Sequence, residues 1–422
     1  MVGGNLGGIA GALAALRSGK QVLLTEETAW IGGQCTVQAV PPDENPWIES
    51  RDTGCTESYR EFRNLIRNHY RSYYPLVKRA LRDPHLNPGE GNVSSLCHEP
   101  RVAHTVLSSM LIPFESSGRL RILHNHEPVK VYASRDKIEA VTFRDPLQGR
   151  DLTIKAAFIL DATDLGDLLP LSGAEHTFGA ECQEESGEPH AVEGNHDYND
   201  QQAFSWCFAI DYLPGTDWTI EKPRGYDFWR SYQAPFWPAP QLSWTTPDPV
   251  TLDPVYRPLF NEPTDILRGT DLWHFRRILY RRNFRKSFFQ SDVSLVNWPQ
   301  IDYWIKPLIG VSREERAKSL ADSRQLSLSF LYWMQTEAET LSGGPGYPGI
   351  RPRGDLLGTG LLALRPYTRE GYRMKTVYTI REQDVGVEAR GKLIGAERYH
   401  DSVGVGSYRI DLHPSSAGRN YL

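Results

Sequence analysis

The chain has 422 residues, enough for two or three domains at roughly 100–200 residues per domain. Hydrophobic residues make up 40% and charged residues 23%, which excludes a disordered or fibrous protein. With 47 Lys and Arg against 52 Asp and Glu, the net charge of -5 gives no overall attraction to nucleic acid or anionic membranes. No apolar run reaches the roughly 18 residues of a membrane span, and no secretory signal is visible, so we expect a cytoplasmic protein.

Cysteine and histidine spacing gives no metal or disulfide signature. The five cysteines are scattered, which argues against a disulfide framework and against a zinc or iron–sulfur site. One loop is rich in possible cation ligands but has no recognised ligand spacing: His190, His196, Asp197, Asn199 and Asp200. We therefore predict no metal site.

The first predicted elements form half of a βαβ unit. A glycine turn at 3–8 opens an Ala- and Leu-rich helix over 8–18, and a strand follows over 21–26. Helical periodicity then predicts helices over 57–82 and 100–116. Turn residues separate four short strands predicted at 119–124, 128–133, 138–144 and 151–159.

The composition changes between about residues 179 and 360. Nine of the 11 tryptophans fall there, which predicts a second domain with an aromatic-rich surface or cavity in which roughly two of the nine line a site. The proline-rich stretch 235–263 reads as a long surface loop. A helix is predicted over 313–341, stopped by the glycines that follow.

The glycine turn has the pattern of a dinucleotide-binding motif, formed by Gly3, Gly4, Asn5, Leu6, Gly7 and Gly8. In this motif the glycines permit a tight turn, close approach of backbone to a pyrophosphate, and contact between helix and strand. The helix N-terminus favours the phosphate anion. Glu26, at the end of the next strand, stands where an acidic residue accepts hydrogen bonds from ribose. Asn5 replaces the usual middle glycine, and asparagine visits positive φ more readily than most residues. The alternative is a glycine-rich helix start without a ligand.

Several segments together resemble a known family. Besides Gly3–Gly8 and Glu26, they are Ile31-Gly32-Gly33-Gln34, Ile159-Leu160-Asp161-Ala162-Thr163, Asn297–Tyr303, Pro366–Glu370 with Arg373, and Asp401–Gly404. Their order and spacing resemble the FAD-dependent oxidoreductase family with a glutathione-reductase type of FAD domain, in the subgroup loosely labelled xanthan-lyase-like.

The resemblance implies positions for the cofactor. Gly32, Gly33 and Gln34 would lie near the flavin, and the backbone near Val129 would flank the adenine. Asp161, Ala162 and Thr163 would close over the cofactor. Asp164 stands where the family usually has glycine.

The resemblance also implies an α/β fold class. We expect a Rossmann-like FAD/NAD(P)-binding domain of three layers (ββα) over residues 1–180, with a helical insertion at 41–95. An inserted α+β substrate domain over 181–364 would interrupt it, and residues 365–422 would return to the FAD domain. Only two residues precede the first glycine, and the closing strand and helix expected after Pro414 are missing, so we expect truncation at both ends.

Candidate catalytic residues come with structural alternatives. His98 could transfer a proton, because histidine side chains usually titrate near neutrality, although a role in helix capping or core packing is the stronger alternative. Arg369, Glu370 and Arg373 could bring charge to the flavin or to a substrate anion, or form ion pairs at a domain junction. Dithiol flavoenzymes need a second cysteine five positions after Cys35, where this chain has valine, so we expect Cys35 to be a small buried residue.

The expected function is FAD-dependent hydride transfer between flavin N5 and a small-molecule substrate, with a sugar-like compound as one candidate. The electron acceptor is not identified, and we expect no nucleic-acid or membrane partner. A run of aromatic and cationic residues at 273–286 could suit nucleic acid, but a helix face paired with acidic neighbours is favoured. Three rivals remain: a nicotinamide-only dehydrogenase, a carbohydrate-binding or polysaccharide-cleaving protein, and a non-catalytic fragment of a flavoenzyme.

Overall fold

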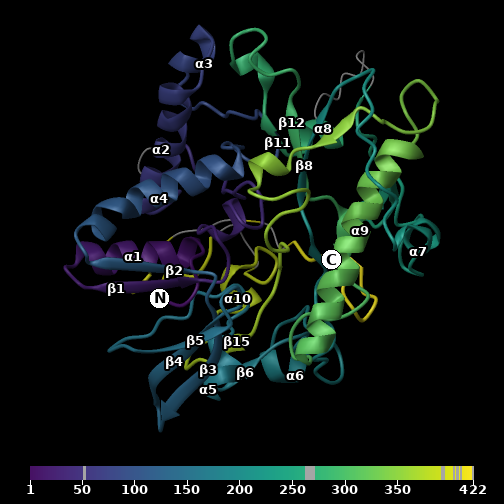
Figure 1. The fold of residues 1–422 in the computed structure, drawn as a ribbon. Coiled ribbons are helices and arrows are strands. Elements are labelled where there is room, and N and C mark those ends of the chain that lie inside the picture. The colour runs from purple at the N-terminus through teal and green to yellow at the C-terminus, as the bar shows by residue number, and fades with distance from the viewer. Residues whose placement is uncertain are drawn as a thin grey trace.

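The computed structural model describes residues 1–50, 54–261, 271–390, 395–402, 404, 408 and 411–420. Within these residues, no helix has the length and apolar character needed to cross a membrane. Figure 1 shows the N-terminal elements on one side of the molecule and the long helix α9 (Arg313–Thr336) on the other.

A small parallel sheet lies at the centre of the N-terminal part. Strands β1 (Val22–Glu26) and β2 (Leu120–His124) pair in parallel. The chain start runs beside β1, because Val2 forms parallel bridges with both Thr25 and Asp161. The glycine turn and the segment after Asp161 therefore both lie at the carboxyl edge of this sheet, where α/β proteins bind ligands.

Helices cover one face of this sheet and an antiparallel meander covers the other (Figure 1). On the helix side, α1 (Leu6–Arg17) and α4 (Pro100–Ser116) share a hydrophobic core with Leu24 of β1. On the other side, Val2 packs with residues of the meander, which consists of β3 (Glu127–Ser134), β4 (Lys137–Asp145) and β5 (Arg150–Lys155). The mixed α/β, Rossmann-like arrangement expected from the sequence is confirmed.

The helix predicted over 57–82 is two helices, α2 (Glu57–Tyr73) and α3 (Lys78–Arg82). Pro75 explains the break, because proline lacks an amide hydrogen and biases the preceding residue toward extended backbone. Tyr74 is accordingly extended, with φ -111° and ψ 143°. The helix predicted over 100–116 has the bounds of α4.

The middle of the chain contains a four-stranded antiparallel sheet in the order β11-β12-β8-β14. Its strands are β11 (Arg277–Leu279), β12 (Val293–Val296), β8 (Phe208–Tyr212) and β14 (Ile350–Pro352).

Helix α9 begins at a capping box formed by Ser312 and Glu315, and it ends five residues before the predicted limit at 341. The run 273–286 is a short helix, a strand and a 3-10 turn, so the predicted helix face is wrong. The predicted pairing with acidic neighbours is found for His274 with Asp271 and for Arg277 with Asp292. The remaining elements are α5 (Leu168–Ser172), β6 (His176–Thr177), α6 (Gln183–Ser186), β7 (Phe204–Ser205), α7 (Tyr226–Ser231), β9 (Thr245–Pro247), β10 (Pro254–Tyr256), α8 (Leu272–Phe275), β13 (Asp302–Tyr303), β15 (Arg373–Met374) and α10 (Glu382–Val385).

The tryptophans of this middle part fill its interior. Of the nine, only Trp218 is substantially exposed, at 44%, whereas the others are 6% exposed or less. Trp244 and Trp333 pack with ring centroids 4.8 Å apart. None of the nine lines a cavity described below, so the predicted aromatic binding surface is wrong. Large aromatic side chains supply core area here instead.

Candidate functional site

The glycine turn is built by close contacts that exclude larger residues. Gly3 has φ +98°, in the region that favours glycine, and a Cβ there would lie 2.1 Å from the Ala162 carbonyl oxygen. A Cβ at Gly8 would lie 2.0 Å from the Gly3 carbonyl oxygen, inside any permitted contact. The tight turn and the close approach of helix to strand, both predicted for these glycines, are confirmed.

Asn5 caps helix α1 rather than adopting a left-handed conformation. Its backbone has φ -74° and ψ -177°, and its side-chain oxygen accepts a hydrogen bond from the Gly8 amide at 3.2 Å. The expectation of positive φ at Asn5 was therefore wrong, because the N-cap position requires extended backbone. Leu6 and Gly7 form the first turn of α1 and line the main cavity described below.

Glu26 lies beneath the turn and is 6% exposed. Its Oε2 accepts from the Gly4 amide at 3.0 Å, and its Oε1 accepts from the Thr28 amide at 2.9 Å and from the Thr28 hydroxyl at 2.8 Å. Burial, reinforced by the neighbouring charge of Glu27, raises the pKa of Glu26 to about 7. Glu26, the acidic residue predicted from its spacing to the glycine turn, therefore contacts that turn directly.

The loop after β1 packs against the same turn. The Gly32 amide donates to the Gly4 carbonyl at 2.7 Å, and Gly32 has φ +117°. A Cβ at Gly33 would lie 2.5 Å from the Asn5 Cβ. Gln34 lies in the main cavity, with its amide nitrogen 3.4 Å from Asp43 Oδ2.

The third segment of the turn region is 161–163. The Asp161 carboxylate accepts hydrogen bonds from the Thr163 amide and hydroxyl and from the Leu168 amide. It therefore shapes the backbone, while Ala162 and Thr163 line a small cavity beside the glycine turn. The same cavity is lined by Gly3, Gly4, Asn5, Glu26 and Gly33.

Asp164 lines three neighbouring cavities. The small cavity at the glycine turn lies between a main cavity of about 650 Å³ and a side cavity of about 480 Å³. Gln38 Nε2 donates to Asp164 Oδ2 at 2.5 Å, and burial raises the pKa of Asp164. The small cavity also shares Asn5 with the main cavity and Glu27 with the side cavity, so the three lie side by side at the N-terminus of α1.

The side cavity is lined by Val129. It is also lined by Glu27 and Arg365, whose charged groups approach to 2.8 Å. Arg313 and Arg316 reach the same cavity from the first turn of α9.

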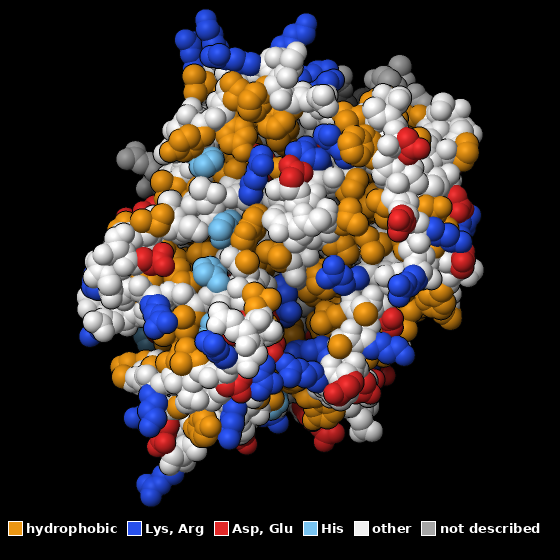
Figure 2. Space-filling model, viewed as in Figure 1, with side chains coloured by type: hydrophobic (Ala, Val, Ile, Leu, Met, Phe, Trp, Pro, Cys, Tyr) orange, Lys and Arg blue, Asp and Glu red, His pale blue; other side chains and the backbone are white. Residues whose placement is uncertain are grey.

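The main cavity is polar and carries both signs of charge. Its ionisable lining residues are Asp43, Asp164, Arg257, Arg276, Arg369, Asp411 and His413. Figure 2 shows Lys and Arg side chains gathered near the middle of the face seen in Figure 1. The mixture of charges and amides suits a polar substrate with several hydrogen-bonding groups.

Of the four candidate catalytic residues, only Arg369 lines the main cavity. Its guanidinium donates hydrogen bonds to the Ala203 carbonyl and to the Ser205 hydroxyl. It also forms an ion pair with Asp302 at 2.9 Å. His98 lies outside the three cavities and is 2% exposed. Burial lowers its pKa to about 4, and its ring packs edge-on against Phe62. These contacts favour the core-packing alternative for His98.

The other two candidates also lie outside the cavity linings. Glu370 Oε2 accepts from the Gln202 amide at 3.2 Å, and burial raises the pKa of Glu370. Arg373 lies in β15 and pairs with Glu181 at 3.0 Å. The Arg373 contact is an ion pair, as the alternative predicted, whereas the contact of Glu370 with Gln202 is a hydrogen bond.

His413, which lines the main cavity, and its buried partner Asp302 were not singled out as site residues from the sequence. Asp302 belongs to the segment Asn297–Tyr303, which was noted only for its resemblance. His413 Nδ1 lies 2.7 Å from Asp302 Oδ2. They are 111 residues apart, so no local spacing could pair them.

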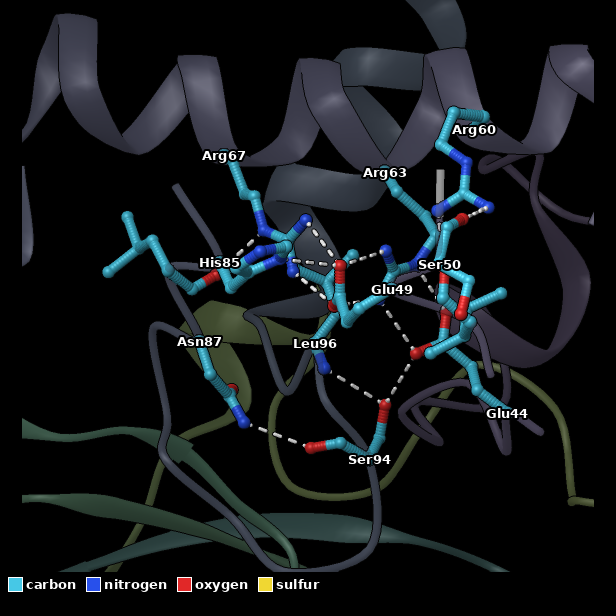
Figure 3. A network of polar contacts seen from close by, with 12 residues as sticks. Glu44, Glu49, Ser50, Arg60, Arg63, Arg67, His85, Asn87, Ser94 and Leu96 are labelled. Atoms are coloured by element: carbon cyan, nitrogen blue, oxygen red, sulfur yellow. Dashed lines mark hydrogen bonds and ion pairs between the residues drawn. The ribbon is translucent and has the colours of Figure 1, made fainter. Parts of the chain in front are cut away.

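An ion-pair network supports one wall of the cavity (Figure 3). Arg63 of α2 is fully buried and pairs with Glu44 and Glu49, each at 2.7 Å. Arg67, one turn later, pairs with Glu49 at 2.6 Å. The network holds the loop that carries Asp43, which lines the main cavity.

Cys35 is 1% exposed, and burial raises the pKa of its thiol well above the usual range. The expectation of a small buried residue is confirmed. Among the residues described, no group of three His, Cys, Asp or Glu side chains could hold a metal ion.

These features fit a dinucleotide. Bare glycine backbone and the N-terminus of a 12-residue helix meet a cavity at the edge of a parallel sheet, with a buried carboxylate below. Residues 1–421 match the family described as FAD dependent oxidoreductase, and the chain belongs to this family of enzymes. FAD is therefore its cofactor. No curated protein sequence matches the chain.

Three solved structures with detectable similarity are described as flavin- or FAD-dependent enzymes or as complexed with FAD. The flavin-dependent monooxygenase PieE, in complex with FAD and substrate, is 13% identical with a TM-score of 0.28, covering 50% of this chain and 34% of its own. The myxobacterial chondrochloren halogenase CndH is 16% identical with a TM-score of 0.26, covering 52% and 44%. The FAD-bound glycerol-3-phosphate dehydrogenase from Bacillus halodurans is 12% identical with a TM-score of 0.27, covering 50% and 39%. The matches thus span less than half of each of these proteins. The family assignment rests on the match over residues 1–421.

Proposed function

We propose that this protein oxidises or reduces a small polar substrate held in the main cavity, by hydride transfer with FAD. The observation that carries the proposal is that Asp164 lines all three cavities, so the dinucleotide turn lies beside a polar cavity of about 650 Å³. The flavin supplies the redox chemistry, and the protein supplies orientation and charge.

The chain offers a residue for each part of the cofactor. Gly3 and Gly4 with the first amides of α1 would hold the diphosphate, and Glu26 would accept hydrogen bonds from ribose. Val129 would flank the adenine in the side cavity. Gln34 of the Gly32–Gln34 loop would lie beside the flavin at the entrance to the main cavity.

The substrate class follows from the lining of the main cavity. Three arginines line the cavity together with three aspartates, so it has no strong net preference for an anion: Arg257, Arg276 and Arg369, and Asp43, Asp164 and Asp411. Side-chain amides of Gln202 and Asn297 add donors and acceptors. A neutral compound with several hydroxyl groups, such as a sugar or polyol, satisfies this lining best.

The visible spectrum of the purified protein, with and without added FAD, tests the proposal. We expect a flavin spectrum whose bands shift on binding, and Glu26→Ala should weaken FAD affinity by at least about tenfold because a charge-assisted hydrogen bond is lost. A Glu61→Ala variant, whose carboxylate forms an exposed pair with Arg17, serves as control. If saturating FAD leaves the protein colourless after desalting, the proposal is wrong.

A further inference from the structure

A buried carboxylate anchors the wall of the main cavity. Asp302, at the start of β13, is 1% exposed. Its Oδ1 accepts from the Ser205 hydroxyl at 2.6 Å and from Arg369 at 2.9 Å, and its Oδ2 is 2.7 Å from His413 Nδ1. Ser205 lies opposite Asp302 because strands β7 and β13 pair in antiparallel register.

This environment keeps Asp302 ionised. Burial by itself raises the pKa of Asp302, but the charge of Arg369 and the hydrogen bonds from His413 and Ser205 act in the opposite direction, and the pKa falls to about 2. An ionised carboxylate can only accept hydrogen bonds, so the proton between the two side chains belongs to His413 Nδ1.

The neutral form of His413 can act as a base. Burial and the charge of Arg369 lower its pKa, while Asp302 and Asp411 act in the opposite direction, and the net shift is downward from 6.5. A neutral ring with its proton on Nδ1 has a lone pair on Nε2. His413 lines the main cavity, and Nε2 lies 3.9 Å from Asp411 Oδ2 at the same wall.

Backbone contacts fix the position of the ring. The His413 amide donates to Gln202 Oε1 at 3.1 Å, and the Ala203 amide donates to the Pro414 carbonyl at 2.8 Å. The carboxylate, the histidine and the cavity are therefore held together by segments that are remote in sequence.

We infer that His413 accepts the hydroxyl proton of an alcohol substrate in the main cavity, and that Asp302 is the residue that positions it. The inference rests on the proposed function and names its substrate class. Oxidation breaks the C–H and O–H bonds of a CH–OH group: the hydride leaves carbon for the FAD of this family, and the proton moves to His413 Nε2. The remaining electron pair forms the carbonyl bond.

The first test follows the proton directly, in FAD-loaded protein containing ¹⁵N-labelled histidine. We expect the NMR signals of His413, assigned by their loss in His413→Gln, to show a protonated Nδ1 and an unprotonated Nε2 at pH 7. Asp302→Asn should lower the titration midpoint of His413 further, because the carboxylate raises its pKa. A His413 ring that is protonated on both nitrogens at pH 7, or on Nε2 alone, would overturn the inference.

The second test measures anaerobic flavin reduction by glycerol, myo-inositol and D-glucose. We expect at least one of them to bleach the flavin, and His413→Ala to slow the reduction by about 10²–10⁴-fold with little change in KM. Added imidazole should restore part of the rate in His413→Ala, which a purely structural role would not permit. His274→Gln is the matched control, because His274 Nδ1 also lies 2.7 Å from a buried carboxylate, Asp271, but its ring does not line the cavity.

The outcomes separate the two proposals. If FAD binds but none of the three polyols reduces it, or if His413→Ala reduces as fast as the unmodified protein, the role of His413 is refuted and the flavin function stands. If FAD does not bind, both proposals fail. Circular dichroism and the flavin spectrum of each variant show whether a lost rate reflects lost folding.

Discussion

The backbone amide of Gly4 donates a hydrogen bond to Glu26 Oε2 over 3.0 Å, so the carboxylate that ends β1 holds the turn that begins α1. This contact joins the two parts of the dinucleotide motif. It also buries a carboxylate whose pKa rises to about 7, which makes the turn sensitive to pH.

In FAD-free protein, the burial of Glu26 should make stability fall as pH rises from about 4.5 to 7. The folded pKa lies above the unfolded value, so the folded state binds more protons in this window, and the free energy of unfolding decreases with pH by up to about 3 kcal/mol. Glu26→Gln cannot ionise and should lack this slope. Urea unfolding at several pH values measures the difference between variant and wild type. A difference that stays constant between pH 5 and 8 would contradict the prediction.

Gly8→Ala should destabilise the protein by about 1–3 kcal/mol or prevent folding, because its Cβ would lie 2.0 Å from the Gly3 carbonyl oxygen. Gly7→Ala is the matched control in the same helical turn. Its Cβ would meet only Asn5 Oδ1 at 3.4 Å, and alanine is the better helix former by up to about 1 kcal/mol. Denaturant unfolding of both variants tests the pair. Equal stabilities would show that helix and strand do not approach as closely as described.

Arg63→Ala should cost about 3–5 kcal/mol of stability, because it leaves buried Glu44 without its ion-pair partner (Figure 3). Arg17→Ala is the control. Arg17 forms an exposed ion pair with Glu61, and its loss should cost at most about 1 kcal/mol. Thermal and urea unfolding give both values. Similar costs for the two variants would indicate that the Arg63 network is hydrated rather than buried.

Asp164→Asn should strengthen FAD binding. Asp164 lines the cavity at the glycine turn, where the diphosphate is proposed to lie, and two negative charges about 8 Å apart repel by about 1 kcal/mol at an effective dielectric of about 40. The bound anion should raise the already raised pKa of Asp164, so wild-type affinity should fall as pH rises and the variant should lose that slope. Fluorescence titration with FAD measures both effects, with Asp136→Asn in the exposed β3–β4 turn as control. An unchanged affinity and slope would place the diphosphate away from Asp164.

Local sequence determined the dinucleotide half of this protein. The glycine turn, the acidic residue at the end of β1 and the helices α1 and α4 each follow from a pattern of a few neighbouring residues. The steric constraints behind these patterns are local, so they can be recognised without knowledge of tertiary contacts. Family resemblance supplied FAD, because cofactor choice depends on several separate motifs whose order the chain preserves. The sequence pattern failed at Pro75, where a single proline interrupts an otherwise continuous helical period.

Only the tertiary structure showed which residues line the main cavity. Composition placed tryptophans around a binding surface, whereas the folded chain buries eight of the nine, because burial depends on which faces of the elements meet. His98 was the histidine with a suggestive neighbourhood in sequence, yet it lies in the core. His413 meets Asp302 only because the pairing of β7 with β13 and the return of the C-terminal segment past Gln202 bring distant residues to one cavity wall. Contacts of that range depend on the whole fold.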